Sequence, residues 1–223
     1  MRADVVGHHR QVKRVILFDH DGVLVDTEPC YYEAGRRALA TIGVPLDQDQ
    51  YLADMTTSGG TWARARAAGV EDAVIDGLRE LRDSYYQHYL RTEAIEIPGV
   101  MDVLAELADR VRMAIVTTSK RVDFELIHAE RRICDHMEVV LVREDYVHAK
   151  PHPEPYLTAL ERLGATPREA LVVEDSARGL RSAVAAGIDC AVVHNAFTAS
   201  HDFSQARYRI RTLAELPDLL ASA

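Results

Sequence analysis

Asp19 and Asp21 follow the apolar run of residues 15–18 and come just before Gly22. The run has the length and β-branching of a buried strand, and residues two apart on a strand point the same way. The two carboxylates therefore share one side of the strand's C-terminal end, the edge where α/β folds bind ligands. Like charges at a partly buried point repel, so we expect one to be protonated or a cation to lie there. The pair could supply a nucleophile and an acid or base, although alone it could equally be two solvated turn residues.

Hydroxyls follow another apolar run, and a lysine lies in a loop further along the chain. Thr117, Thr118 and Ser119 come after residues 112–116, just before an expected helix, where hydroxyls and N–H groups suit an anionic oxygen. Simple N-capping by Ser119 explains the same pattern. Lys150 lies in a proline-rich loop, where it could neutralise both carboxylates and a phosphate, although a solvated loop lysine is the ordinary alternative.

Two more acids, Glu174 and Asp175, end the apolar run of residues 170–173. With Asp19 and Asp21 they make four carboxylates at the ends of two strands. Such converging oxygen ligands suit Mg²⁺, which keeps some of its waters and bridges to phosphates.

Alternating strands and helices must position these groups. We expect strands at residues 15–19, 112–117, 138–142, 170–174, 189–193 and 208–210, and helices at 100–108, 122–130, 153–163, 176–186 and 212–221. This alternation predicts an α/β fold with a doubly wound parallel sheet. Residues 46–97 lack strand-like runs, and a long helix is expected at about residues 71–90. We therefore expect a core of residues 1–27 and 98–223, with a small α-helical cap inserted as residues 28–97.

Composition excludes several classes of protein. The chain has 223 residues, 48% of them apolar, and a net charge of −9, which argues against nucleic-acid and anionic-membrane partners. The sequence contains no apolar stretch of 18 residues. Three widely spaced cysteines indicate free thiols in a reducing, cytoplasmic compartment. Residues 1–10, including His8 and His9, are interpreted as a loose tail.

The order Asp-x-Asp-Gly, strand-end Thr, Lys-Pro and Glu-Asp resembles the haloacid dehalogenase (HAD) superfamily. Within it, the chain is most similar to the β-phosphoglucomutase-like phosphatases, which carry a helical cap after the first strand. The resemblance covers nearly the whole chain from residue 15 and is most specific in FDHDGVLVDTEP and VVEDSARGLRSAVAAG. It implies a Mg²⁺-dependent phosphatase acting on a small-molecule phosphate ester, such as a sugar or polyol phosphate. We expect a monomer or weak dimer.

The resemblance also implies roles for the acids. Asp19 would be the nucleophile that forms an aspartyl-phosphate. Asp21 would be the general acid for the leaving alcohol and then the base for water, and its backbone carbonyl would bind Mg²⁺. The metal site would comprise Asp19, Asp21, Glu174 and Asp175, with Glu174 binding directly or through water.

Three other positions match the phosphate-binding groups of the family. The Thr117 hydroxyl and the Thr118 N–H would hold the phosphoryl oxygens. Lys150 would bridge the nucleophile and the phosphate.

Other activities remain as alternatives. Dehalogenases of the superfamily lack the second aspartate, and the phosphonate-cleaving branch needs a cap lysine that residues 28–97 do not contain. A sugar phosphomutase is the main rival, because Arg64 or Arg66 could reach a second phosphate. His88, the single cap histidine, is interpreted as structural. A non-catalytic binding or regulatory module on the same fold is a more remote alternative.

Four other residues have assigned interpretations. His20 should point away from the two aspartates and is given no catalytic role. Tyr31 and Trp62 could line the pocket beside the cap or simply pack within it. Thr27 is the expected N-cap of the helix that follows it.

Overall fold

A six-stranded parallel sheet forms the centre of the protein. The structure is a computed structural model that describes residues 13–55, 60–193 and 195–222. The strand order is β3-β2-β1-β4-β5-β6, and every pair is parallel. The strands are β1 (Val15–Phe18), β2 (Arg112–Val116), β3 (Val139–Leu141), β4 (Ala170–Glu174), β5 (Asp189–Val193) and β6 (Tyr208–Ile210). The predicted doubly wound α/β fold is confirmed, and the expected strand at residues 138–142 is shorter in the structure.

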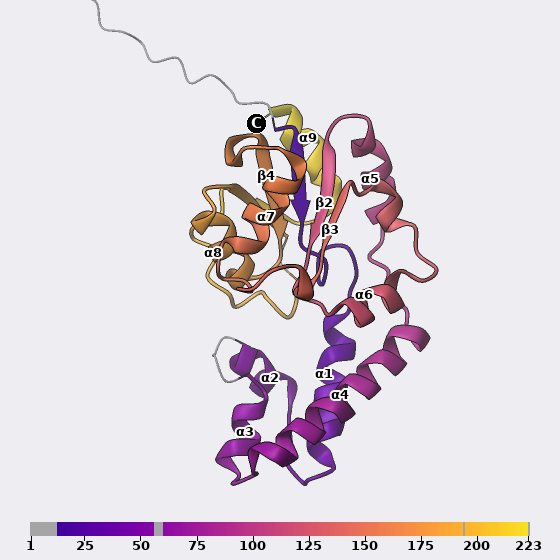
Figure 1. Cartoon of the computed structure of the whole chain (residues 1–223), viewed down its shortest axis with the longest axis vertical. Coiled ribbons are helices and arrows are strands. Elements are labelled where there is room, and N and C mark those ends of the chain that lie inside the picture. Colours follow the sequence, from indigo (N-terminus) through magenta and orange to yellow (C-terminus); the bar gives the residue numbers. More distant parts are fainter. Residues whose placement is uncertain (1–12, 56–59, 194, 223) are drawn as a thin grey trace, which may run out of the picture.

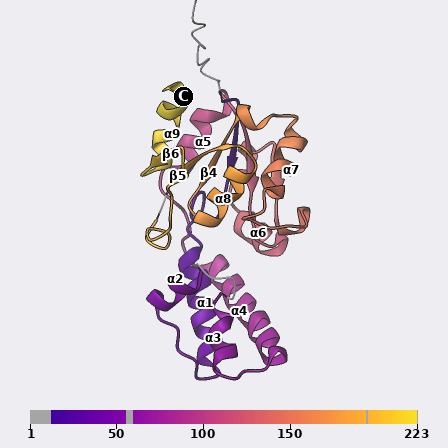
Figure 2. The same ribbon diagram turned by 90° about the vertical axis from the view of Figure 1, so that its left-hand side faces the viewer.

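Helices cover both faces of the sheet (Figure 2). Ile16 and Phe18 of β1 pack in one apolar cluster, and Val15 and Leu17 pack in another. The first face is covered by α5 (Val100–Ala108), α6 (Arg121–His128) and α9 (Leu216–Ser222), the second by α7 (Glu154–Leu163) and α8 (Ala177–Ala185). Because β1 is buried on both faces, its residues are apolar without alternation. Short 3₁₀ helices span Ile133–His136, Arg143–Asp145, Pro167–Glu169 and Leu213–Glu215.

In the part of the chain that the structure describes, four helices between β1 and α5 form a separate lobe below the C-terminal ends of the strands (Figure 1). They are α1 (Glu28–Ala40), α2 (Gln48–Met55), α3 (Trp62–Ala67) and α4 (Asp72–Thr92). A small apolar core of this cap includes Leu39, Tyr51 and Ile75. The helical insertion agrees with the sequence, whereas its boundaries at residues 28 and 97 stay a prediction. The expected long helix is α4, which extends to Thr92 instead of residue 90.

Polar contacts join the cap to the core across α4 and α6. Lys120 Nζ lies 2.6 Å from Asp83 Oδ2, and Gln87 Nε2 donates to Asp123 Oδ1 at 2.9 Å. These contacts place the cap over the C-terminal end of β2. The candidate catalytic side chains lie at this edge of the sheet. Among the described residues, no helix is both long and apolar enough to cross a membrane. The tail at residues 1–10, with His8 and His9, falls outside the described residues.

Candidate active site

Lys150 joins two of the acids that the sequence predicts to meet. Its Nζ donates to Asp19 Oδ1 at 2.6 Å, to Glu174 Oε1 at 2.8 Å and to the Val116 carbonyl at 2.8 Å. The side chain is buried, and the two carboxylates raise the pKa of its ammonium against the opposing effect of burial. Lys150 is therefore a fixed positive charge next to Asp19.

Asp19, Glu174 and Asp175 each offer an oxygen within 4.8 Å of the others. Burial, followed by the charge of Glu174, raises the pKa of Asp19 to about 7. Burial and the charges of Asp19 and Glu174 also raise the pKa of Asp175 well above its usual value. These shifts mark an excess of buried negative charge that a divalent cation would relieve. An all-oxygen ligand set of this kind fits Mg²⁺.

Glu174 is held by donors of the protein on both of its oxygens. Oε1 accepts from Lys150 and from the Tyr156 hydroxyl, the latter at 2.7 Å, and Oε2 accepts from Ser176 Oγ at 3.0 Å. Burial opposes its ionisation, but Lys150 and the hydrogen bonds outweigh burial and lower its pKa. Gly179 makes room for this carboxylate, because a Cβ there would lie 1.6 Å from Oε1. With its oxygens so occupied, Glu174 fits a cation best through a water.

Asp175 is placed by a close backbone approach. Gly22 has a φ of +79°, and a Cβ there would lie 2.2 Å from Asp175 Oδ2. The turn after β1 therefore needs glycine both for its conformation and for space. Asn195 Nδ2 donates to the same oxygen at 3.0 Å. Asp175 Oδ1 has no such contact with a described residue, so it is available to a ligand.

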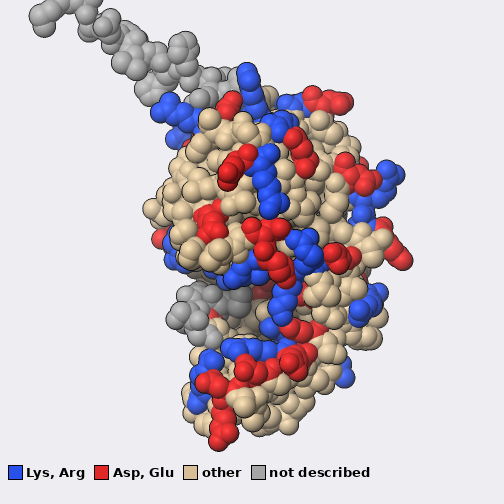
Figure 3. Space-filling view, in the orientation of Figure 1, with Lys and Arg blue, Asp and Glu red and all other residues tan. Residues whose placement is uncertain are grey.

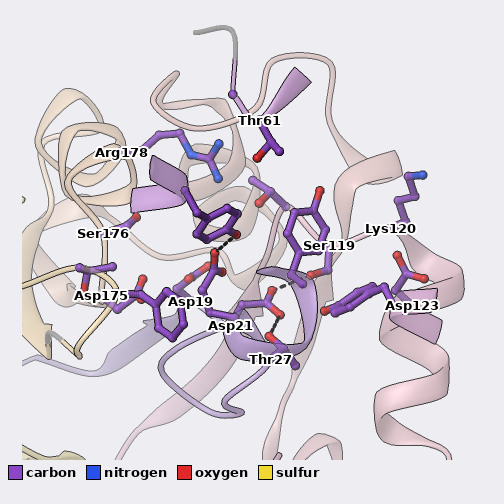
Figure 4. A pocket seen from close by; sticks show the side chains of 18 of the residues that line it. Asp19, Asp21, Thr27, Thr61, Ser119, Lys120, Asp123, Asp175, Ser176 and Arg178 are labelled. Atoms are coloured by element: carbon purple, nitrogen blue, oxygen red, sulfur yellow. Dashed lines mark hydrogen bonds between the residues drawn. The ribbon is translucent and has the colours of Figure 1, made fainter. Parts of the chain in front are cut away.

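The Asp21 carboxylate accepts hydrogen bonds from three hydroxyls. Thr27 Oγ1 and Ser119 Oγ donate at 2.5 Å, and Thr117 Oγ1 donates at 3.2 Å. Although burial favours the neutral acid, the electrostatic interaction with His20 and the hydrogen bonds to this carboxylate hold the pKa of Asp21 below its usual value. Asp21 is therefore in its base form in this arrangement. Figure 4 shows it beside Asp19 on the floor of the pocket.

Thr27 is the N-cap residue of α1, as expected, but its side chain makes no capping hydrogen bond. The alternative interpretation of Ser119 as an N-cap is wrong, because Lys120 holds that position of α6. Both hydroxyls donate to Asp21 instead, because the turn after β1 brings this carboxylate within their reach. In contrast, the Ser176 side chain caps α8 and accepts from the Gly179 N–H.

The two predicted phosphate-binding threonines differ in exposure. Thr117 is fully buried, and its hydroxyl contacts Asp21 and accepts from the Ser119 N–H. Thr118 lines the pocket. The Thr117 hydroxyl would have to turn from Asp21 to reach a phosphoryl oxygen, so its assigned role stays a prediction.

His20 does not simply point away from the aspartates. It is fully buried, and its Nε2 lies 2.8 Å from His128 Nε2. Its Nδ1 lies 3.4 Å from Asp21 Oδ2, without hydrogen-bond geometry. The sequence could not show this contact because His128 is 108 residues away.

A cavity of about 490 Å³ lies between cap and core above these acids. Tyr31 and Trp62 line it, as the sequence suggested, and the Arg82 guanidinium lies over both rings. Tyr51 donates to Glu28, and burial raises the pKa of this glutamate. Figure 4 shows Asp175, Ser176 and Arg178 on one side of the cavity and Lys120 and Asp123 on the other.

Several residues considered from the sequence lie elsewhere. Arg64 pairs with Asp54 within the cap, and Arg66 pairs with Asp72. His88 is exposed on α4 and is not among the residues that line the cavity. Residues 56–59 of the cap fall outside the described residues, and Gly60 lines the cavity.

The sequence did not indicate that four residues donate hydrogen bonds to the acids of the site: Thr27, Ser119, Tyr156 and Asn195. Asn195 had a usable signal, because it follows β5 at the same sheet edge as the acids. Tyr156 had none, since its position on α7 is simply that of an apolar core residue.

Comparison with known proteins identifies the family. The family model described as haloacid dehalogenase-like hydrolase matches residues 16–193. The chain belongs to this family. It is 31% identical over 225 residues to "Protein CbbY" of Rhodobacter capsulatus, covering 94% of this chain and 95% of that protein. It is 30% identical over 190 residues to "Phosphorylated carbohydrates phosphatase" of Thermotoga maritima, covering 81% and 85%.

Solved structures of HAD-like proteins share the fold. A mutant CbbY from Rhodobacter sphaeroides in complex with xylulose-(1,5)bisphosphate superposes with a TM-score of 0.79 at 27% identity. The match covers 92% of this chain and 96% of that one. With phosphatases among its relatives, this HAD-like chain is an enzyme of the phosphoric monoester hydrolase type.

Proposed function

We propose that the protein is a Mg²⁺-dependent phosphatase that hydrolyses a small phosphorylated metabolite, a sugar or polyol phosphate, through an aspartyl-phosphate intermediate. The observation that carries this proposal is the meeting of Asp19, Lys150, Glu174 and Asp175 beneath the cavity between cap and core. Named relatives include a phosphorylated carbohydrates phosphatase and a fructose-1-phosphate phosphatase, which supports the substrate class.

In the first half-reaction, a carboxylate oxygen of Asp19 attacks phosphorus and the bond to the ester oxygen breaks. Lys150 holds Asp19 by a 2.6 Å hydrogen bond and offsets negative charge at the transferred group. Asp19 and Asp175, with Glu174 behind them, would hold Mg²⁺, which would supply further charge neutralisation and orient the phosphate. Asp21 takes up a proton from solvent and donates it to the departing alkoxide, which leaves as the alcohol.

In the second half-reaction, water attacks phosphorus and the bond to Asp19 breaks, which regenerates the free carboxylate. Asp21 accepts the proton of that water. The base form of Asp21, held by the Thr27, Ser119 and Thr117 hydroxyls, suits this step directly.

The contacts of the cap weigh against the phosphomutase alternative. A mutase has to bind a second phosphate, and both candidate cap arginines are already paired with aspartates, Arg64 at 2.5 Å and Arg66 at 2.9 Å. Hydrolysis requires no such second site.

The direct test is phosphate release from p-nitrophenyl phosphate and from a panel of sugar and polyol phosphates, with and without Mg²⁺. We expect Mg²⁺-dependent release, and we expect Asp19→Asn to lower kcat by at least about 10³-fold while the protein still unfolds cooperatively. Asp76→Asn, which removes an exposed carboxylate on α4, is the matched control. Conversion of β-glucose 1-phosphate to glucose 6-phosphate without phosphate release would support the mutase. An Asp19→Asn variant with full turnover would rule out Asp19 as the nucleophile.

A further inference from the structure

A second cluster of ligand groups lies in the loop that carries Lys150, outside the cavity. His148, His152 and Glu154 each offer one atom that could bind a metal ion, and the three atoms lie within 4.8 Å of one another. We propose that these residues form a surface site for a late first-row divalent cation such as Zn²⁺. This inference is independent of the proposed phosphatase activity.

Glu154 is a fixed and ionised ligand. Its carboxylate accepts from the Val147 N–H at 2.7 Å and from the His148 N–H at 2.9 Å. These backbone bonds and the His148 side chain lower the pKa of Glu154 to about 2. The carboxylate is therefore charged at neutral pH, and the two backbone bonds reduce the entropy that a metal ion would remove on binding.

The two imidazoles converge on the same carboxylate oxygen. His148 Nδ1 lies 2.6 Å and His152 Nδ1 lies 3.8 Å from Glu154 Oε2. Their ring centroids are 4.6 Å apart. In the tautomer that is protonated at Nε2, His148 Nδ1 carries the free lone pair and faces Glu154 Oε2, so binding of one ion by both atoms needs only a small increase in their separation. His152 Nδ1 accepts only a 3.2 Å bond from the Glu154 N–H, which a metal could replace at small cost.

The loop limits the reorganisation that binding would require. Three prolines alternate with the candidate ligands: Pro151, Pro153 and Pro155. Because each proline ring restricts its own φ angle, the backbone of this loop has little freedom to lose on binding. Both histidine side chains are at least half exposed, so a hydrated ion can reach them without opening the fold. A preordered loop favours binding because less conformational freedom is lost.

Ligand chemistry separates this site from the acidic one beneath the cavity. Two imidazoles and one carboxylate suit Zn²⁺ and its neighbours, with a fourth position left for water. Asp19, Glu174 and Asp175 provide oxygen alone, which suits Mg²⁺. Excess Mg²⁺ should therefore saturate the acidic site and leave the histidine site open.

The test is calorimetric titration of Zn²⁺ into the full chain in excess Mg²⁺, without substrate. His8→Ala and His9→Ala are included in every protein so that these two histidines cannot contribute. We expect one Zn²⁺ per chain, with binding weakened at least about tenfold in both His148→Ala and His152→Ala. His88→Ala, which removes an exposed histidine of the cap, should bind as the parent does.

Anomalous diffraction at the zinc edge locates the ion. We expect density between His148, His152 and Glu154 that persists in excess Mg²⁺. Equal affinity in the parent and both loop variants, no binding at all, or zinc found only beside Asp19 and Asp175 would each overturn the proposal. Because the readout needs no turnover, a failed phosphatase assay would not affect it.

Discussion

Asp19 lies where burial and neighbouring carboxylates oppose its ionisation. Its pKa is raised to about 7, first by burial and then by the charge of Glu174, and Lys150 offsets only part of this. A nucleophile must be deprotonated to attack phosphorus, so the state of this carboxyl links metal binding to pH.

Mg²⁺ affinity should therefore rise with pH and level off above about pH 7. Below that value the metal-free protein holds a proton on Asp19 that Mg²⁺ has to displace, at a cost of about tenfold in affinity per pH unit well below the pKa. Titration calorimetry at several pH values measures this, with Asp76→Asn as the control. Affinity that stays constant from about pH 5.5 to 8 would contradict the proposed role of Asp19 as a ligand.

Thr27 provides a second test at a single residue. Its hydroxyl donates to Asp21 at 2.5 Å, and a bond to the charged form of an acid lowers its pKa. Thr27→Val keeps the shape of the side chain and removes this donor, so the pKa of Asp21 should rise. At saturating Mg²⁺, which displaces the proton from Asp19, the acid limb of the kcat profile should then move to higher pH. Thr41→Val removes a hydroxyl that bonds only the Ala38 carbonyl and should leave the profile unchanged.

At the scale of elements, the end of β1 meets α6 through two histidines. His20 and His128 contact each other at Nε2, and the Nδ1 atoms of both are buried without a hydrogen-bond partner among the described residues. Burial and the charge of His20 lower the pKa of His128 from 6.5 to about 3. The folded protein thus keeps His128 neutral at a pH where the unfolded chain would protonate it.

This contact should make the fold sensitive to acid. Between pH 6.5 and about 3 the unfolded chain binds the extra proton, so stability falls as pH falls through this window. His128→Gln stays neutral and can still bond His20, so its Tm should decline less from neutral pH to about pH 4 than that of the unaltered protein. His88→Gln, on an exposed position, should decline as the unaltered protein does. An equal decline in all three would contradict the buried, neutral state of His128.

The sequence predicts those parts of the site that depend on strand ends. Asp19, Glu174 and the β2 hydroxyls could be placed together because parallel strands end at one edge of a sheet. The hydrogen bonds from Thr27 and Ser119 to Asp21 could not be predicted, because capping rules are local and Asp21 reaches these hydroxyls through tertiary contact. The His20–His128 contact likewise joins distant segments with no shared periodic pattern.

At the scale of the whole molecule, cap and core each supply one wall of the cavity. Acidic and basic side chains are mixed over both lobes on the face in Figure 3, in keeping with a net charge of −9 that offers little attraction to nucleic acid. Substrate choice therefore depends on groups inside the cavity. Among the described residues, four Lys or Arg side chains line the cavity, and three of them are already engaged: Arg82 with Asp83, Lys120 with Asp83, and Arg143 with the Tyr146 carbonyl.

Arg178, on α8, is the fourth and has no hydrogen bond or ion pair with any described residue. Its guanidinium is thus free to bind an anionic group at the far end of a substrate.

We expect Arg178→Ala to lower kcat/KM for 4-carboxyphenyl phosphate by about 10- to 100-fold. The variant should change kcat/KM for p-nitrophenyl phosphate much less, because the nitro group has the shape of a carboxylate without its charge. Arg178→Lys should restore part of the loss. Arg181→Ala, an exposed position on the same helix that does not line the cavity, should affect neither ester. An equal effect of Arg178→Ala on both esters would show that Arg178 does not bind the carboxylate at the far end of the substrate.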